Sequence, residues 1–416
     1  MPNYSCGEGL RILSPLSPAS GPSGLDVSRE TSRRPTVRSA AWRGRFTPLT
    51  VLLLLLLAVP LLIGCTTDVD SPDGWAGAVR ADEFTILQEK AGELVAIRLG
   101  GADNPGTADI DERVAWRFPG DGDDVDLDAV YASPILDGNT LYVAGHSGEV
   151  VALDLTFEPP QIVWVRDLDE NIVASPAFDG RTLYVGTEAG TIVPITVASG
   201  AVGQPIAQAG ERIWSAVLLE GGALYVAALD KRVRAISPAG GTIWAQPTEL
   251  SGAVPGDSAL QGDLLVVGSF DRRLHALDAG TGAEEWVFDG DGWFWARPVI
   301  AGDTIYAAST RGSIYALNAG GSDASRVRWR FNQLDSEIRA APVLAGGVLV
   351  VAAEEATIWG IDPATGDLRW SAPLPGHRFL ADPLVLDSSL IYATTRGDLI
   401  EIDPQSGRAA ILYERR

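Results

Sequence analysis

A unit of about 41 residues recurs along this chain. The stretch DGNTLYVAGHSGEVVALD, residues 137–154, returns in altered form as DGRTLYVGTEAGTIVPIT at 179–196 and as AGDTIYAASTRGSIYALN at 301–318. One apolar residue in each LYV-like segment marks a copy, and the eight markers are Phe84, Leu141, Leu183, Leu224, Leu265, Ile305, Leu349 and Ile391. Their spacings are 57, 42, 41, 41, 40, 44 and 42 residues. Such a period is typical of a solenoid or a propeller.

Each copy has the pattern of short β-strands. TLYVAG and GEVVALD both alternate in period two, and glycine separates them, which predicts a hairpin. A last strand is expected around a tryptophan in most copies, at Trp116, Trp164, Trp244, Trp286, Trp329 and Trp370. Four short strands in this length form one propeller blade, and a closed ring protects the sheet edges. We therefore predict an all-β fold over residues 75–416, an eight-bladed β-propeller of four-stranded blades. Seven blades are the alternative if the segment before Val114 does not form one.

The repeated residues are predicted to build the fold and not to carry chemistry. A tryptophan on the closing strand offers a large flat surface that fills the wedge between twisted blades. Glycines such as Gly138, Gly148, Gly180 and Gly190 permit turns with positive φ that other residues resist.

The N-terminal residues predict export. Residues 1–46 are rich in Ser, Pro and Arg, and PLTVLLLLLLAVPLLIGC follows, an apolar run of signal-peptide length. The segment Leu62–Cys65 resembles the bacterial lipobox, in which the cysteine is lipidated and becomes the first residue of the mature chain. We expect residues 1–64 to be a lipoprotein signal peptide with an extended leader and 65–74 to be a flexible tether after lipidated Cys65. An uncleaved anchor is the alternative, and either arrangement places the body outside the cytoplasm, on the cell envelope.

The net charge disfavours some classes of partner, and the cysteine content bears on disulfides. The 54 acidic and 32 basic residues give a net charge of −22, which disfavours nucleic acid and the anionic face of a membrane as partners. Only Cys6 and Cys65 are present, and Cys6 lies in the predicted signal peptide, so no disulfide is expected.

The repeat carries a family resemblance. Its pattern ASP…DG…LYV…G…VALD…W, with variants such as LHALDAGTGAEEW and IWGIDPATGDLRW, resembles the repeat of the pyrroloquinoline-quinone-like (PQQ-like) β-propellers. That family includes quinoprotein dehydrogenases and the cofactor-free propeller lipoprotein of the outer-membrane β-barrel assembly machinery. The resemblance extends over about Trp75 to Arg416, and it implies a fold and no single function.

Neither a cofactor nor catalysis is expected. The resemblance to quinoprotein dehydrogenases implies a vicinal disulfide beside the quinone, and the predicted mature chain has no cysteine pair. His146, His275 and His377 are the only histidines, and no Ser-His-acid set or metal-ligand spacing can be assembled around them. A weak calcium alternative is an acidic run between two predicted blades, which lacks the glycine and the distal glutamate of an EF-hand loop: Asp121, Asp123, Asp124, Asp126 and Asp128.

Binding is expected at the connections between blades, which in a propeller surface on one face beside the channel mouth. Aromatic and arginine residues are enriched in interface hot spots, and here they interrupt an acidic sequence. The candidates are Trp214, Trp293, Phe294, Trp295, Arg297, Glu337, Arg339, His377 and Arg378, with Tyr131 and Asn171 at other connections. The alternative is that Trp214 and Trp295 merely plug the channel.

These observations favour a lipid-anchored scaffold that binds a protein partner, with a role in envelope protein assembly. One alternative is an envelope receptor for a small molecule or polysaccharide, with Trp293 and Trp295 as stacking platforms. Another is a degenerate quinoprotein enzyme, for which the sequence offers no nucleophile.

Overall fold

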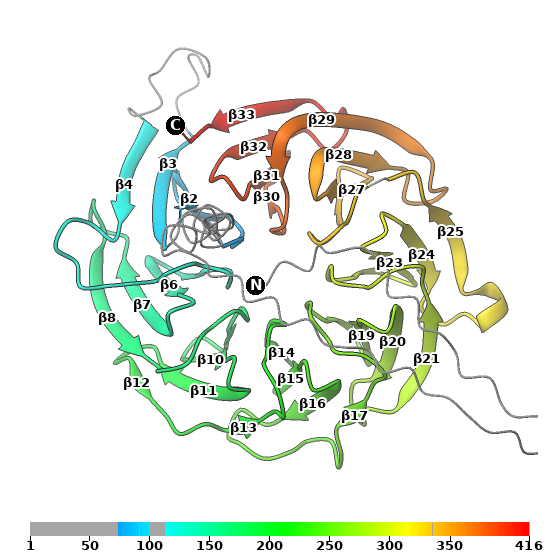
Figure 1. Ribbon diagram of the computed structural model, residues 1–416, viewed down its shortest axis with the longest axis horizontal. Coiled ribbons are helices and arrows are strands. Elements are labelled where there is room, and N and C mark those ends of the chain that lie inside the picture. The colour runs from blue at the N-terminus through cyan, green and yellow to red at the C-terminus, as the bar shows by residue number, and fades with distance from the viewer. Residues whose placement is uncertain (1–73, 91, 100–112, 335, 416) are drawn as a thin grey trace, which may run out of the picture. The chain divides into compact units, whose positions relative to one another are not determined.

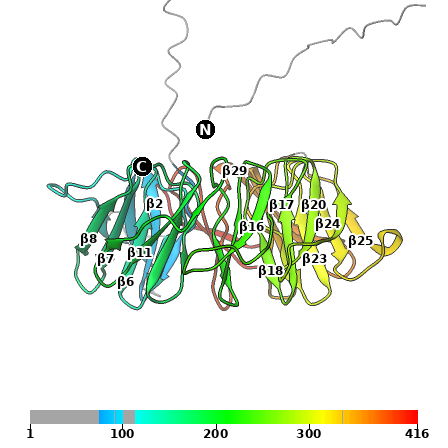
Figure 2. The same cartoon turned by 90° about the horizontal axis from the view of Figure 1, so that it is seen from below.

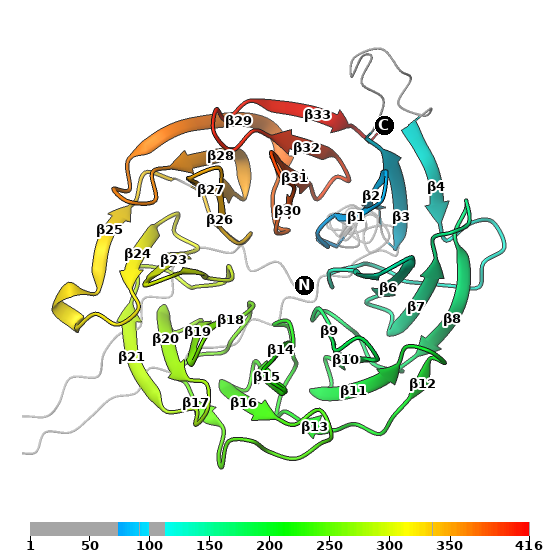
Figure 3. The same cartoon turned by 180° about the vertical axis from the view of Figure 1, so that it is seen from behind.

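Eight antiparallel sheets surround a central axis in the computed structural model (Figure 1). It describes residues 74–90, 92–99, 113–334 and 336–415, which belong to one compact unit of residues 71–416. Within each sheet the strands follow one another in chain order from the axis to the rim, which is also visible from behind (Figure 3). The eight-bladed prediction is confirmed. The seven-bladed alternative is wrong, because the segment that begins before Val114 forms a four-stranded sheet of its own.

Blades 1 to 4 cover the first half of the ring. Blade 1 contains β1 (Val79–Ala81), β2 (Phe84–Lys90), β3 (Glu93–Arg98) and β4 (Val114–Phe118). Blade 2 contains β5 (Ile135–Asp137), β6 (Thr140–Ala144), β7 (Glu149–Asp154) and β8 (Gln161–Asp167). Blade 3 contains β9 (Ala177–Phe178), β10 (Thr182–Gly186), β11 (Thr191–Thr196) and an outer strand split into β12 (Ala201–Val202) and β13 (Ala207–Gln208). Blade 4 contains β14 (Leu218–Glu220), β15 (Ala223–Ala227), β16 (Arg232–Ile236) and β17 (Thr248–Glu249).

Blades 5 to 8 complete the ring. Blade 5 contains β18 (Ala259–Gln261), β19 (Leu264–Gly268), β20 (Arg273–Asp278) and β21 (Glu284–Asp289). Blade 6 contains β22 (Val299–Ala301), β23 (Thr304–Ala308), β24 (Ile314–Asn318), the 3-10 turn η2 (Asp323–Ser325) and β25 (Val327–Phe331). Blade 7 contains β26 (Val343–Ala345), β27 (Val348–Ala353), β28 (Glu355–Ile361) and β29 (Leu368–Arg378). Blade 8 contains β30 (Leu384–Val385), β31 (Leu390–Ala393), β32 (Leu399–Ile402) and β33 (Ala409–Tyr413).

The two middle strands of each blade form the core. Period-two alternation predicts half-buried strands, yet β6 and β7 are buried at nearly every position, and β27 is buried at all six. Both faces of a middle strand are covered because a neighbouring blade packs on each side. Small and apolar residues therefore occupy both faces, and the polar positions lie at the strand ends.

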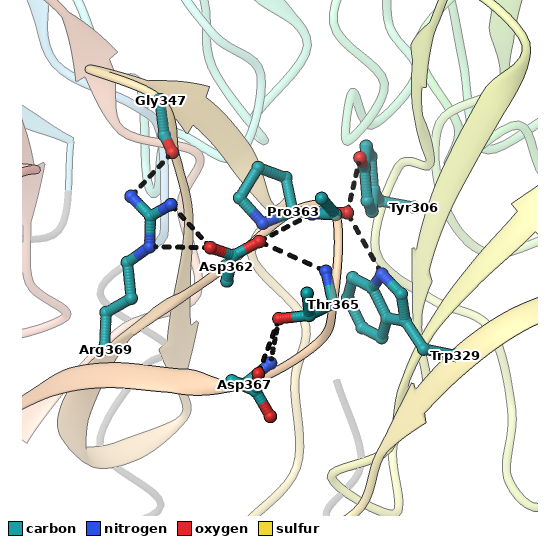
Figure 4. A network of polar contacts seen from close by, with 9 residues as sticks. Tyr306, Trp329, Gly347, Asp362, Pro363, Thr365, Asp367 and Arg369 are labelled. Carbon is teal, nitrogen blue, oxygen red and sulfur yellow. Dashed lines mark hydrogen bonds and ion pairs between the residues drawn. The ribbon is translucent and has the colours of Figure 1, made fainter.

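Tryptophans on or just before the outer strands join five pairs of neighbouring blades. Trp329 of β25 donates its indole N–H to the carbonyl oxygen of Pro363, 3.0 Å away in blade 7, and the Tyr306 hydroxyl donates to the same oxygen (Figure 4). Asp362, in the same turn, accepts from the guanidinium of Arg369 at 2.6 Å. The equivalent indole bonds join Trp164 to Val197, Trp244 to Ala279, Trp286 to Ala319 and Trp370 to Pro404, at 2.8–3.0 Å. The predicted packing role of these tryptophans is thus confirmed, and a directional bond is added to it.

The ring closes by side-chain contacts between blades 8 and 1. No strand is exchanged among the described residues, because each of these two sheets is built from consecutive strands. Instead, the Tyr413 hydroxyl donates to Glu89, which also accepts from Arg117 at 2.9 Å. Burial would raise the pKa of Glu89, but hydrogen bonds from Arg117 and Tyr413 bring it below its usual value. Two residues 324 positions apart in sequence thereby fasten the seam.

In the described part of the chain, no helix is long and apolar enough to cross a membrane. The predicted signal peptide, Cys65 and most of the predicted tether lie outside the described residues.

Candidate interaction surface at the channel mouth

One backbone hydrogen bond recurs in seven blades and gathers the connections on a single face. An N–H in the turn between the second and third strands donates to a carbonyl in the connection that enters the same blade, at 2.7–3.1 Å. The pairs are His146–Ala129, Glu188–Asn171, Leu229–Arg212, Phe270–Ala253, Thr310–Trp293, Glu354–Glu337 and Thr395–Arg378. We call these connections and turns the loop ring. It belongs to one of the two faces seen edge-on in Figure 2.

Four aromatic side chains of blades 4 to 6 are in contact within the loop ring. Trp214 lies 6.4 Å from Trp295, measured between ring centroids, and Trp295 lies 5.6 Å from Phe270. Phe270 in turn lies 4.8 Å from Trp293. Trp293 is 47 % exposed, whereas Trp214 and Trp295 are half-buried. We call these four residues the aromatic patch. Among the described residues, Trp293 is the one exposed large apolar side chain on a connection of the loop ring.

Phe294 does not belong to this surface, although the sequence made it a candidate. Its side chain is 0 % exposed and packs against Phe288 and Tyr315 in the core between blades. A Cβ on Gly268 would lie 2.8 Å from the Phe294 Cβ, which shows how closely the backbone of β19 approaches it. Phe294 is therefore a core residue, and its exposed neighbour Trp293 is the one available to a partner.

Charged residues border the aromatic patch on the blade 7 and 8 side. The guanidinium of Arg339 lies 5.1 Å from the Trp295 ring, an attractive cation–π geometry. Arg339 also pairs with Glu337 at 2.8 Å and with Glu354 at 3.2 Å. Arg378 pairs with Glu354 as well and is exposed. The charges on this side of the loop ring are therefore largely matched.

His377 and Arg297 lie at the edges of the loop ring. His377 is half-buried, and its Nε2 lies 3.6 Å from a carboxylate oxygen of buried Asp398. Arg297 precedes β22 and pairs at 3.1 Å with Asp382, which precedes β30 two blades further on. This ion pair joins blades 6 and 8, next to their innermost strands.

Asp257 shares the channel with this ion pair. Its carboxylate accepts the Ala216 N–H at 2.6 Å. Burial raises the pKa of Asp257 to about 6, and the negative charge of Asp382 adds to the shift, while the Ala216 bond and Arg297 oppose it. Asp257 is half-buried, so solvent in the channel reaches it only in part.

On the blade 2 and 3 side of the loop ring, Tyr131 and Asn171, which the sequence made binding candidates, lie beside residues that it did not. The His146 ring lies 3.0 Å from Asp128 and 3.3 Å from the Asn171 amide, and Tyr131 packs edge-on against it. Trp214 donates to Glu188 at 2.7 Å, which joins this side to the aromatic patch. Trp75 packs 4.3 Å from the Tyr131 ring, a contact that no repeat position indicates.

The acidic run between blades 1 and 2 is exposed. Asp123 accepts the Gly120 N–H and Asp126 accepts the Asp128 N–H, both within the connection itself. Among the described residues, no group of three or more His, Cys, Asp or Glu side chains could hold a metal ion. The calcium alternative therefore gains no support from the geometry.

His275 is a buried histidine away from the loop ring surface. It is 3 % exposed, with Asp271 3.0 Å from one ring nitrogen and Glu284 2.9 Å from the other. Burial alone would lower the pKa of His275, but the bonds to these two carboxylates raise it above its usual value. The cluster ties the β19–β20 turn to β21, and no nucleophile is bonded to it.

Eight four-stranded blades with indole bonds between neighbours define a β-propeller of the PQQ-like repeat type. The sequence profile of the family described as the outer membrane protein assembly factor BamB matches residues 77–228, 229–324 and 296–413. The chain belongs to this family. A search of the curated proteins finds no match.

Two solved structures resemble the propeller. BamB from Moraxella catarrhalis is 18 % identical, with a TM-score of 0.61 over 78 % of this chain and 92 % of that one. The computationally designed Ika8 protein is 14 % identical, with a TM-score of 0.65 over 80 % of this chain and 96 % of that one. At these identities the likeness concerns the fold alone.

Proposed function

We propose that this protein is a scaffold for envelope protein assembly, and that it holds a polypeptide partner on the loop ring. Membership of the family of an outer membrane protein assembly factor supports the role. The observation that supports the site is the aromatic patch: Trp293 is 47 % exposed and continuous with half-buried Trp295 and Trp214. A large exposed aromatic residue with ordered aromatic neighbours is typical of an interaction site.

The scaffold is proposed to be exported and anchored by lipid on Cys65. The apolar run and the lipobox-like segment support export, and the described chain begins beside the loop ring, because Trp75 and Ala76 both donate to the Val130 carbonyl. Intact mass of the mature protein tests the anchor: a lipidated chain starting at Cys65 is expected, and an unlipidated chain that begins before Cys65 would refute it.

No catalytic role is proposed. The buried polar clusters around His275 and Glu89 bond blade to blade or strand to strand, and neither contains a nucleophile. The loop ring offers contact area and charge, which suits binding.

The test of this function is a double variant, Trp293→Ala with Arg378→Ala, in the full-length protein. Both side chains are more than 40 % exposed, so the melting temperature should change by only a few degrees. Loss of an interface anchor typically costs on the order of 2 kcal/mol, or roughly thirtyfold in affinity. Partner recovery from the native envelope should therefore fall steeply.

The control is Phe157→Ala with Arg408→Ala. Phe157 is 45 % exposed, in the turn between β7 and β8, and Arg408 lies in the equivalent turn of blade 8, so both are remote from the loop ring. This variant should recover the partner like the wild type. Equal recovery by both double variants would reject the loop ring as the partner site.

A further inference from the structure

Nine carboxylates on the blade 2 and 3 side of the loop ring have neither Lys nor Arg among them. They belong to segments 119–134, 167–176 and 187–190, which contain neither Lys nor Arg. We call them the acidic arc: Asp121, Asp123, Asp124, Asp126, Asp128, Asp167, Asp169, Glu170 and Glu188. Seven of them are exposed, and Arg212 of the next connection reaches Glu188 only at 3.9 Å. Negative charge is thus concentrated on one side of the channel mouth.

The acidic arc is continuous with the aromatic patch. Glu188 accepts the Trp214 indole N–H at 2.7 Å, and Trp214 contacts Trp295. On its far side the patch meets Arg339, whose charge is matched by Glu337 and Glu354. Arg272 and Arg311 are exposed in the blade 5 and blade 6 turns beside the patch, so a ligand lying on the patch meets negative charge in the direction of the acidic arc.

We infer that the loop ring binds a cationic, partly apolar segment of another polypeptide, with aromatic or aliphatic side chains on the aromatic patch and Lys or Arg side chains toward the acidic arc. This inference rests on the proposed function and adds the chemistry of the partner. Opposite charges across an interface speed association and set orientation, and buried aromatic anchors slow dissociation. In this surface the acidic arc speeds association and sets orientation, and the aromatic patch slows dissociation.

An anionic occupant fits this surface poorly. Acidic polysaccharides and anionic lipid headgroups would place like charge beside seven exposed carboxylates of the arc. A neutral glycan would use the tryptophans alone and leave the acidic arc without a role. A cationic polypeptide uses both parts of the surface.

The experiment measures binding of two short fluorescent peptides to the full-length protein. The peptides have the same Phe and Leu residues and differ in having Lys or Glu at the remaining positions. The Lys peptide should bind at least tenfold more tightly, and its affinity should fall when salt is raised from about 50 to about 300 mM, since screening weakens exposed charge pairs.

Two variants separate the roles. Asp121→Asn with Asp124→Asn and Asp169→Asn should slow association of the Lys peptide several-fold and flatten its salt dependence. Trp293→Ala should mainly speed its dissociation, by roughly tenfold or more. The charge control is Asp137→Asn with Glu220→Gln and Asp263→Asn, which removes three exposed carboxylates at the hairpins between first and second strands and should leave both rates unchanged.

The outcomes distinguish this inference from the proposed function. If both peptides bind equally and Trp293→Ala weakens both, the site stands and the cationic preference is wrong. If a neutral glucan binds at Trp293 and neither peptide does, the polypeptide partner is wrong. If the Lys peptide binds and neither variant alters its rates, the loop ring is not the binding site. The proposed function is then wrong about where the partner binds.

Discussion

At neutral pH, the charged carboxylate of Asp257 lowers the stability of the folded protein. Its carboxylate is enclosed by the channel wall and has the Ala216 N–H as a bonding partner, while the neighbouring ion pair joins Arg297 to Asp382. Burial and the charge of Asp382 raise the pKa of Asp257 from 3.8 to about 6. The folded protein therefore binds this proton more tightly than the unfolded chain does. Its contribution to stability is lost as pH rises from about 4 through about 6.

We predict that Asp257→Asn stabilises the protein at neutral pH. Asparagine keeps an oxygen for the Ala216 N–H and removes the unfavourable charge. A shift of about two pKa units corresponds to roughly 3 kcal/mol, and partial solvent access should reduce the gain to about 1–2 kcal/mol. Denaturant unfolding at pH 7 and at pH 4 checks this. The gain should vanish at pH 4, and an equal gain at both values would contradict the account.

At the scale of the element, the contact between neighbouring blades depends on a tryptophan and a glycine together. Gly282, in the turn before β21, faces the Trp244 ring of the preceding blade, where a Cβ would lie 2.6 Å from a ring atom. Gly200, Gly366 and Gly407 face Trp164, Trp329 and Trp370 in the same way. Blade 6 is an exception, because the Trp286 ring of blade 5 is contacted by the Arg326 guanidinium, which lies 4.1 Å from it. Glycine therefore recurs in this turn, because the tryptophan ring occupies the space that a Cβ would need.

We predict that Gly282→Ala destabilises the propeller more than Gly262→Ala. Both glycines have positive φ, +76° and +60°, so both substitutions strain the backbone by about 1 kcal/mol. Only Gly282 has a neighbour within 4 Å, so its substitution adds an overpacking cost of about 1–3 kcal/mol. Urea unfolding of the two variants measures the difference. Equal free energies of unfolding would show that the Trp244 contact tolerates the extra methyl group.

The repeat predicts the elements well because its signals are local. Period, turn glycines and outer-strand tryptophans lie within one copy, so blade number and packing role follow from the sequence. The proposed partner surface is different, since it is assembled from several copies. Phe270 lies at a turn position where other copies have residues such as His146, Glu188 or Thr310, and that departure is the one signal that marks it. Phe294 is adjacent to Trp293 in sequence, and only the structure shows that the Phe294 side chain lies in the core while that of Trp293 is exposed.

At the scale of the whole molecule, closure of the ring is what brings the candidate residues together. Trp214, Trp293 and Arg339 come from connections of three different blades, and they meet because the connections lie on one face. Closure in turn depends on the seam at Glu89, Arg117 and Tyr413. Distant parts of the chain are thereby held at fixed distances, which suits a surface that works by contact.

The measurement that tests the central claim most directly is site-specific photo-crosslinking in the native envelope. A photo-crosslinking amino acid replaces Trp293 in one full-length protein and Phe157 in another, two positions with exposed fractions of 47 % and 45 %. The account predicts a discrete polypeptide adduct from position 293 and none from position 157. An adduct from position 157 alone would place the partner site on the opposite face and contradict the account.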